Sequence, residues 1–429
     1  MVNIAKVTLW NQKVGSLARD EQSGNIFFEY DPEFSKKGIE PSPLFVPVKK
    51  GVVYNFNELN YNTYRGLPGF IADSLPDTFG NYLINTWLAK QGRDPERYNT
   101  IERLLFQGSR AMGALCFEPE TSTTLNKSVE IELNTLVDIA LQALQFKKTL
   151  DTNISDNEKA LQTIIRIGTS AGGSRAKAVV AYNKSTGHIL SGQVDAPDGF
   201  EHYLLKMDGV TNGSLGDPAY YGCLEYSYYK IALECGIEMT ESFLLPDGKR
   251  KHFMTKRFDR VGGSHRIHMV TLCGLAHSDF NTPGAFAYEY LLGVMRQMHL
   301  TSAEMEQAFR RMVFNVVGRN QDDHTKNFSF LLDTDNVWKL SPAYDMTYAY
   351  KPDGDYTNMH QMSINGKRDN IKREDLLAVA ENASIKTSKA QSIISEIEDV
   401  FKNIDNYLEP DIPESIVNRV KSNLRVGKL

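Results

Sequence analysis

The feature that most constrains the fold is the segment NFSFLLDTDNVWKLSP, residues 327–342. Its two short apolar runs, FSFLL and VWKLS, flank the turn-forming residues DTDN, a pattern that predicts a β-hairpin. From about residue 284 onward the spacing of apolar residues is otherwise helical, and the tail from residue 373 is helical again. The chain therefore has to place one hairpin inside a helical region.

The earlier part of the chain alternates apolar and polar residues as strands do. VTLW (7–10) and NIFFEY (25–30) predict strands separated by a turn-rich segment, and LFVPVKKGVVYNF continues in the same style. Residues 66–92 change to a helical period, with Pro76 suited to the first turn, and residues 110–119 return to extended structure. Further strands are predicted at 179–183, 202–209 and 252–260.

Composition narrows the class of protein. The 429 residues are 41% hydrophobic and 24% charged, which is ordinary for a globular protein with two or three domains. The formal net charge of −5 argues against a chain that coats nucleic acid unaided. The four cysteines form no CxxC pair, the start lacks the plan of a signal peptide, and no apolar run is long enough to cross a bilayer. We expect a cytoplasmic protein.

The polar run RNQDDHTKN, residues 319–327, contains the frame D-x-x-x-x-N in Asp322 and Asn327. Protein kinases place a catalytic aspartate and a metal-binding asparagine at this separation. The aspartate orients or accepts the hydroxyl proton of the attacking group, and the amide oxygen holds Mg²⁺ without adding charge. The hairpin that follows ends in SPAYDM, so Asp345 stands where kinases carry a second metal-binding aspartate. The alternative is structural: Asp322 and Asp323 cap a turn and Asp345 caps a helix.

The glycine-rich stretch GTSAGGSRAKAVVAY, residues 168–182, could let backbone N–H groups approach phosphate. It is not a Walker A loop, because Ser174 and Arg175 stand where that motif requires Lys followed by Ser or Thr. A kinase-like lid and a flexible surface loop both remain open. Lys206, in HYLLKMDG, fits the phosphate-binding strand lysine of kinases or a lysine that reaches solvent from a strand edge.

His324 leaves a different chemistry open. A DDH cluster could bind zinc or a pair of metal ions in a hydrolase. Such sites usually recruit further histidines, and His265, His268 and His277 show neither HxxxH nor HxH spacing. The order of glycine-rich loop, strand lysine, D-x-x-x-x-N, hairpin and aspartate favours a kinase over this alternative.

Several separated motifs in this order resemble those of the HipA-type serine/threonine kinase toxins of bacterial toxin–antitoxin modules. The motifs are GLPGFIADSLPDTFGNYLI, GSRAMGALCFEP, GTSAGGSRAKA, YLLK, KRFDR, NQDDHTKNFSFL and LSPAYDM. The resemblance implies an α+β, atypical protein-kinase-like fold with a β-rich N-terminal subdomain and a mostly α-helical C-lobe. The expected segments are an N-terminal subdomain at 1–120, a kinase N-lobe with the glycine-rich loop at 121–257, and the helical C-lobe at 258–429.

The resemblance also implies roles for individual residues. Asp322 would be the catalytic base, Asn327 and Asp345 the Mg²⁺ ligands, and Ser170 an autophosphorylation site. The backbone at Lys256 and Phe258 would face adenine, and Asp259 would lie near the ribose. The full expected ATP-binding set is Ser170, Ala171, Gly172, Gly173, Lys177, Lys206, Lys256, Phe258, Asp259, His324 and Lys326. Two positions depart from relatives. Ala176, just before Lys177, stands where many relatives have proline or an acidic residue. Lys256 is basic where relatives have an acidic residue, a change that a backbone contact to adenine should tolerate.

The implied cofactors are ATP and Mg²⁺. The implied partners are a HipB-like helix-turn-helix antitoxin, operator DNA reached mainly through that antitoxin, and a protein substrate such as an aminoacyl-tRNA synthetase. Two alternatives stay open: a catalytically silent kinase-like scaffold that acts as an antitoxin-bound corepressor, and a metal-dependent phosphohydrolase.

Overall fold

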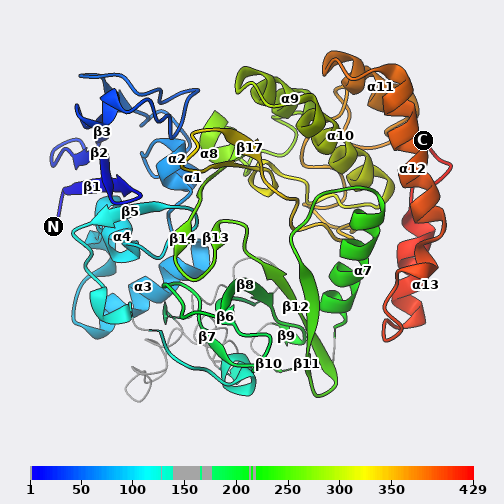
Figure 1. The fold of residues 1–429 in the computed structure, drawn as a ribbon, viewed down its shortest axis with the longest axis horizontal. Helices are drawn as coiled ribbons and strands as arrows, with labels where there is room; N and C mark the ends of the chain where they lie inside the picture. Colours follow the sequence, from blue (N-terminus) through cyan, green and yellow to red (C-terminus); the bar gives the residue numbers. More distant parts are fainter. Residues whose placement is uncertain (1, 127, 139–164, 167–175, 212–213, 216–218) are drawn as a thin grey trace. The chain divides into compact units, whose positions relative to one another are not determined.

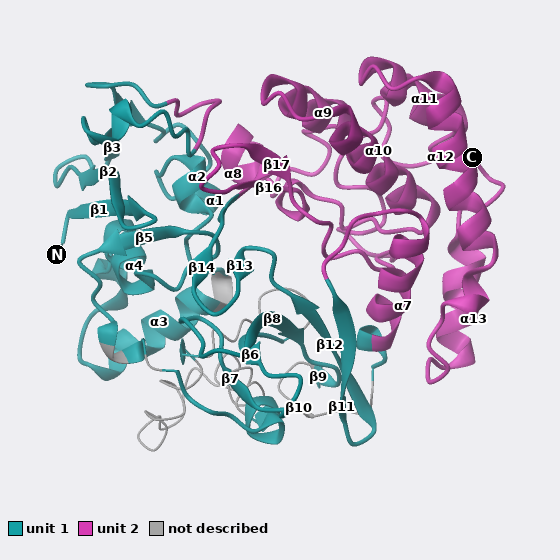
Figure 2. Ribbon diagram, in the orientation of Figure 1, with its two compact units in different colours: residues 1–41, 48–222, 241–269 teal, residues 42–47, 223–240, 270–429 magenta. Residues whose placement is uncertain are grey.

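The computed structural model describes residues 2–126, 128–138, 165–166, 176–211, 214–215 and 219–429 (Figure 1). The chain divides into two compact units (Figure 2). Unit 1 comprises residues 1–41, 48–222 and 241–269, and unit 2 comprises residues 42–47, 223–240 and 270–429. The three segments expected from the sequence, 1–120, 121–257 and 258–429, remain a prediction, because compactness alone does not define a domain boundary.

Unit 1 begins with an antiparallel five-stranded sheet of order β4-β3-β2-β1-β5. Trp10 and Asn11 both have positive φ angles, 48° and 60°, as a two-residue hairpin turn between right-twisted strands requires. The strands are β1 (Ile4–Leu9), β2 (Gln12–Arg19), β3 (Ile26–Tyr30), β4 (Val53–Asn55) and β5 (Leu115–Glu118).

The strand β2 shows where the sequence prediction was wrong. Residues between the first two predicted strands were expected to be turn-rich, yet Gln12–Arg19 pairs with β1 on one side and β3 on the other. Its buried Val14 and Leu17 supply the apolar contacts, and pairing on both sides satisfies the backbone of its polar residues. The predicted extension through LFVPVKKGVVYNF was also too long, since it yields only β4.

In residues 61–107 of unit 1 the helices are α1 (Tyr61–Tyr64), α2 (Gly69–Ala72), α3 (Thr78–Lys90) and α4 (Thr100–Gln107). Asp77 caps α3 by accepting a hydrogen bond from the backbone N–H of Gly80. Pro76 therefore precedes the cap, and its expected place in the first turn is wrong. Asn99 and Glu102 form a capping box at α4, a helix the sequence analysis did not predict.

A second antiparallel sheet in unit 1 has the order β11-β12-β8-β6-β7. Its strands are β6 (Lys177–Tyr182), β7 (Ile189–Ser191), β8 (Glu201–Lys206), β11 (Ser242–Asp247) and β12 (Arg250–Lys256). Three of them confirm the strands predicted at 179–183, 202–209 and 252–260. Ala178, Val180, Tyr203, Leu205 and Met254 belong to a core that also contains apolar side chains of α3 and α4. Two-residue strands complete the unit: β9 (Val210–Thr211), β10 (Ser214–Leu215), β13 (Arg260–Val261) and β14 (His265–Arg266).

Unit 2 is mostly helical, with one small sheet of order β15-β16-β17. The chain enters this unit within β15 (His268–Thr271), and β16 (Ser329–Leu332) pairs antiparallel with β17 (Trp338–Leu340). This confirms the hairpin predicted at 327–342. The helices are α7 (Tyr221–Glu234), α8 (Leu272–Ala276), α9 (Tyr288–Gln297), α10 (Ser302–Val317), α11 (Arg373–Asn382), α12 (Thr387–Lys402) and α13 (Glu414–Asn423).

The helix α10 positions the polar run that follows it. Thr301 and Glu304 form a capping box at its start, and Met305, Phe309 and Met312 are buried along one face. Arg319 then takes a left-handed conformation, with φ of 58°, which turns the chain out of the helix. Within the described part of the chain, no helix combines the length and the apolar character that crossing a membrane requires.

Candidate active site

Two lysines of unit 1 lie directly opposite each other in the second sheet. The register pairs Lys177 of β6 with Lys206 of β8, and Phe253 of β12 with Lys206 from the other side. Residues paired in this way share one face of a sheet. Lys206 is 4% exposed on the middle strand of five, which excludes the alternative of a lysine reaching solvent from a strand edge. Two like charges at opposed positions suit a face that receives a multiply charged anion.

The same face borders a cavity of about 340 Å³ in unit 1. Lys177, Val179 and Leu204 line it from the sheet, Gln193 and Arg257 add polar groups, and Asp73 and Asp77 are the acidic residues of its described lining; Lys206 is not part of that lining. An apolar floor with a few converging polar groups is typical of a small-molecule site. Lys177 was predicted from the sequence, whereas Gln193 and Arg257 were not, although Arg257 lies inside the KRFDR motif.

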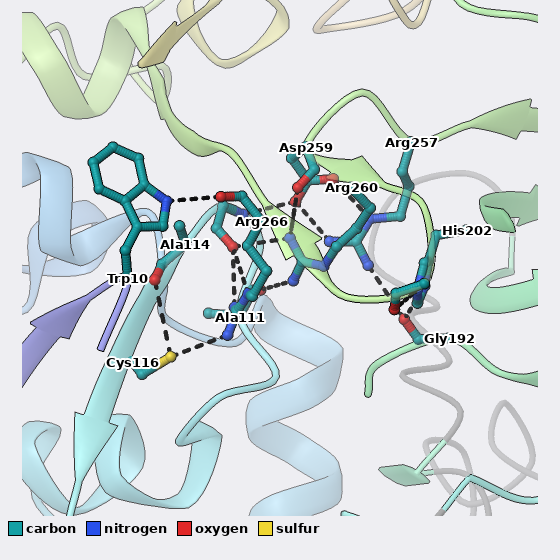
Figure 3. A network of polar contacts seen from close by, with 12 residues as sticks. Trp10, Ala111, Ala114, Cys116, Gly192, His202, Arg257, Asp259, Arg260 and Arg266 are labelled. Carbon is teal, nitrogen blue, oxygen red and sulfur yellow. Dashed lines mark hydrogen bonds and ion pairs between the residues drawn. The ribbon is translucent and has the colours of Figure 1, made fainter. Parts of the chain in front are cut away.

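Asp259 is held in a buried ion network (Figure 3). Arg257 donates to both carboxylate oxygens, at 2.8 and 2.6 Å, and Arg260 donates to one of them at 2.8 Å. The backbone N–H of Gly113 donates to the same carboxylate at 2.7 Å. Burial by itself would raise the pKa of Asp259, but the two arginine charges outweigh it and hold that pKa well below its usual range. This geometry favours an anchoring role over the expected ribose contact.

The network extends to the N-terminal sheet (Figure 3). Arg260 and Arg266 donate to the carbonyl oxygens of Ala111 and Gly113, and the indole of Trp10 donates to the carbonyl of Arg266 at 2.8 Å. Gly113 has φ of +72°, a conformation that favours glycine, and it offers both its N–H and its C=O to the network. These contacts join the two sheets of unit 1 and fix the segment after β12.

The basic residue at the expected hinge has a local partner. Lys256 forms an ion pair with Glu201 on the neighbouring strand β8, and this hydrogen bond lowers the pKa of Glu201. The backbone N–H of Lys256 donates to the carbonyl of Glu241 at 2.9 Å, so in this structure that N–H is not available to adenine. Phe258 is half-buried. Ser170, Ala171, Gly172 and Gly173 lie outside the described residues.

In unit 2 the polar run forms a compact loop that ends in a short 3₁₀ turn, Thr325–Asn327. The side-chain amide of Asn327 donates to the carbonyl of Asp322 at 2.7 Å, which leaves its amide oxygen as the group suited to a cation. The Asp322 side chain is 42% exposed, as a group that meets a substrate must be. The hydroxyl of Tyr344 donates to the carbonyl of Lys326 at 2.6 Å. The segment of Asp345 is thereby joined to the segment of Asn327.

Asp345 adopts a left-handed conformation, with φ of 56°. Such backbone strain in a residue other than glycine is often found at functional sites. No helix starts at Asp345, since the next helix in sequence is α11, so the expectation that it caps a helix is excluded. Two carboxylates and an amide oxygen form the hard oxygen set that Mg²⁺ prefers, so the donor chemistry of Asp322, Asn327 and Asp345 fits that ion.

Asp323 points the other way and anchors the loop. Its side chain is 0% exposed and accepts hydrogen bonds from the Tyr288 hydroxyl and His360 Nδ1, both at 2.8 Å, and from the Gln361 N–H at 2.7 Å. Burial raises the pKa of Tyr288 well above its usual value, so its phenol remains a donor. This anchoring role was not predicted from the sequence; in the structure the two adjacent aspartates differ, with the Asp322 side chain 42% exposed and the Asp323 side chain buried.

His324 and Lys326 both contact Phe280. The His324 ring centroid lies 5.6 Å from that of Phe280, and Lys326 Nζ lies 4.5 Å from the same ring. Burial lowers the pKa of His324, which favours the neutral ring. The part of the chain that the structure describes contains no group of three His, Cys, Asp or Glu side chains placed to hold a metal ion.

The anchoring of Asp323 gives a stability prediction. Replacing Asp323 with Ala leaves three buried donors without their acceptor, so we expect the free energy of unfolding to fall by roughly 3 kcal/mol or more. Urea denaturation would measure this. The matched control is Asp335→Ala, because the Asp335 side chain is 47% exposed in an ion pair with Lys339 and its loss should leave the free energy of unfolding nearly unchanged. Equal stability of the two variants would contradict the anchoring role.

Comparison with known proteins places these features in one family. Residues 169–404 match the HipA-like C-terminal domain, which is more than half of the chain, and residues 5–118 match the HipA N-terminal domain. The chain belongs to the HipA family. This confirms the family and the α+β kinase-like fold class inferred from the sequence motifs.

Two individual proteins illustrate the relationship. A chain from the Shewanella oneidensis MR-1 toxin–antitoxin complex of HipA, HipB and operator DNA superimposes with a TM-score of 0.69 at 17% identity, covering 97% of this chain and 95% of that one. At this identity the likeness shows the shared HipA fold. A candidate kinase of Haemophilus influenzae is 29% identical over 136 residues, which is 28% of this chain. The match spans 39% of the length of that curated relative.

Proposed function

We propose that this HipA-like kinase transfers the γ-phosphate of Mg²⁺·ATP to serine or threonine hydroxyl groups of a protein. The observation that carries the proposal is the hydrogen bond from Tyr344 to the carbonyl of Lys326, at 2.6 Å. This bond links the segment that carries Asp345 to the segment that carries Asn327, and the Asn327 side chain donates to the Asp322 carbonyl. The three oxygen-bearing side chains of the kinase frame thus come from one tightly connected loop pair.

Each group has a role that its chemistry suits. Asp322, exposed at the end of the loop, orients the acceptor hydroxyl and takes its proton. Asn327 and Asp345 would hold Mg²⁺, which when bound neutralises phosphate charge. Lys206 and Lys177 supply positive charge to the phosphates from the face of β8 and β6, with His324 and Lys326 as further contacts. The backbone at Phe258, rather than the engaged N–H of Lys256, would meet adenine, and residues 170–173 would cover the phosphates.

The family relationship supports a proposal for the biological role. The Shewanella relative was solved with HipB and its operator DNA. We propose that this chain is a growth-inhibiting toxin of a toxin–antitoxin module, bound by a HipB-like helix-turn-helix antitoxin. Its net charge of −5 suits contact with operator DNA mainly through that partner. The proposed substrate is a translation component such as an aminoacyl-tRNA synthetase, in the cytoplasm, where the four free cysteines would stay reduced.

The experiment that tests this proposal compares phosphorylated proteins in cells that express the wild type with cells that express Asp322→Ala. We expect growth arrest and a small set of new phosphoserine or phosphothreonine sites with the wild type alone. Growth arrest by both proteins without new phosphosites would favour the silent corepressor scaffold instead. Release of phosphate from ATP with no labelled protein acceptor would favour a phosphohydrolase.

Ser170 is the proposed regulatory site. A phosphoserine carries about −1.5 to −2 charges, and in a loop that covers ATP phosphates it would repel them and abolish nucleotide binding. We expect intact mass to rise by one phosphate after incubation with ATP, but not in Ser170→Ala. Fluorescence titration of the phosphorylated form should then show loss of ATP affinity. Unchanged affinity in the phosphorylated form would refute this control mechanism.

A further inference from the structure

A second cavity, of about 700 Å³, lies within the N-terminal part of unit 1 and is lined by residues between positions 19 and 103. Its lining contains three arginines, Arg19, Arg65 and Arg103, while Glu96 is the one acidic residue among the described residues that line it. Five asparagines, Asn25, Asn57, Asn81, Asn85 and Asn99, add amide groups. This composition differs from that of the candidate active site, whose lysines belong to another sheet.

The charge of Arg103 is not balanced by a carboxylate. Its guanidinium donates to the amide oxygens of Asn81 and Asn85, at 3.0 and 2.9 Å, and weakly to the carbonyl of Pro95 at 3.5 Å. All three acceptors are neutral. Burial lowers the pKa of Arg103; Tyr98 and, more weakly, Glu102 act to raise it, while the positive charge of Arg65 lowers it. A half-buried guanidinium held by neutral oxygens beside a second arginine is an arrangement that an anion would stabilise.

The other two arginines of the lining, Arg19 and Arg65, also have no ion pair with a carboxylate among the described residues. Arg65 stacks over the ring of Tyr61 at 5.1 Å. Tyr61 is 61% exposed, so its ring could be covered by a planar group. Arginine binds phosphate through paired N–H donors, and the cavity has the volume of typical small-ligand sites.

We propose that this cavity binds a small phosphate ester of about the size of a nucleoside monophosphate, with Arg19, Arg65 and Arg103 holding its negative charge. The arginines pair with the phosphate oxygens, and Asn25, Asn85 and Tyr61 contact the remainder of the ligand, since Asn57, Asn81 and Asn99 use their amide groups in internal hydrogen bonds. The site is independent of the proposed kinase reaction, because none of its lining residues belongs to the catalytic set.

The test is calorimetric titration of the full chain with inorganic phosphate and with AMP, in EDTA and without Mg²⁺ or ATP. We expect both to bind to the wild type, and Arg19→Gln and Arg103→Gln to weaken binding about tenfold or more. The matched control is Arg97→Gln, which removes the same charge from a side chain that is 81% exposed and outside the cavity lining. The Arg97→Gln variant should bind phosphate and AMP with the wild-type affinity. Glu96→Gln should tighten binding, because it removes the acidic group of the lining.

Each outcome of the titrations either supports or overturns the proposed phosphate site. Tighter binding of AMP than of phosphate identifies a nucleotide ligand, and equal binding identifies recognition of the phosphate alone; both support the site. Absence of binding to the wild type at millimolar concentration overturns the proposal. Equal affinities of the Arg19→Gln and Arg97→Gln variants for phosphate and AMP would also overturn it. Arg19→Gln keeps the test valid if Arg103→Gln unfolds, because Arg19 makes none of the internal contacts of Arg103, and thermal melting of each variant checks the fold.

Discussion

Asp322→Asn is expected to reduce phosphate transfer from ATP by about 10²- to 10⁴-fold, the range that a positioned general base contributes. Asparagine has the shape of aspartate but cannot accept the proton of the acceptor hydroxyl at neutral pH. The loop itself should survive, because the contact that fixes it uses the backbone carbonyl of Asp322, with the amide of Asn327 as donor. Labelled ATP and mass spectrometry of the protein acceptor would measure the loss.

The control for this variant is Asp335→Asn, an equal change at an exposed position of the β16–β17 hairpin loop. Its transfer rate should match the wild type. Nucleotide binding by Asp322→Asn should be largely retained, since Asn327 and Asp345 are untouched. Transfer at the wild-type rate by Asp322→Asn would remove the kinase mechanism proposed here, whichever protein is the acceptor.

Lys206→Met should weaken ATP binding by tenfold or more and lower transfer by about 10²-fold. Methionine keeps the apolar stem and the volume of the buried lysine on β8, so the loss reports the charge rather than the packing. Lys177→Met removes the opposed charge on β6 and should produce a smaller loss, because the Lys177 side chain is less deeply buried. Fluorescence titration with ATP and a transfer assay would separate affinity from rate.

The control for the lysine pair is Lys184→Met. Lys184 follows β6, is 40% exposed and pairs with Glu241, so its replacement should leave both ATP affinity and transfer rate near the wild-type values. If Lys206→Met and Lys184→Met bind ATP equally well, the lysine face of the second sheet is not the phosphate site.

The elements with strong local signals were predictable. The β16–β17 hairpin follows from turn residues between two apolar runs, and α10 follows from its capping box and helical period. The strand β2 was not, because its alternation is interrupted by polar residues whose backbone is satisfied only once both neighbouring strands are in place. The helix α7 was not predicted for a different reason. Its apolar and aromatic residues lie on most sides of the helix, so the sequence shows no clear apolar stripe with a helical period.

The sequence by itself determined the family, the kinase-like fold class and the order of Lys206, Asp322, Asn327 and Asp345, because motifs and periods are local properties of the chain. Only the tertiary structure decided what neighbouring groups do. In the structure, Asp259 accepts hydrogen bonds from Arg257, Arg260 and the distant Gly113. Asp323 is buried and accepts a hydrogen bond from Gln361, and Lys177 pairs with Lys206 across two strands. Contacts between residues far apart in sequence leave no periodic signal, so register and burial must be known before a charged side chain can be given a role.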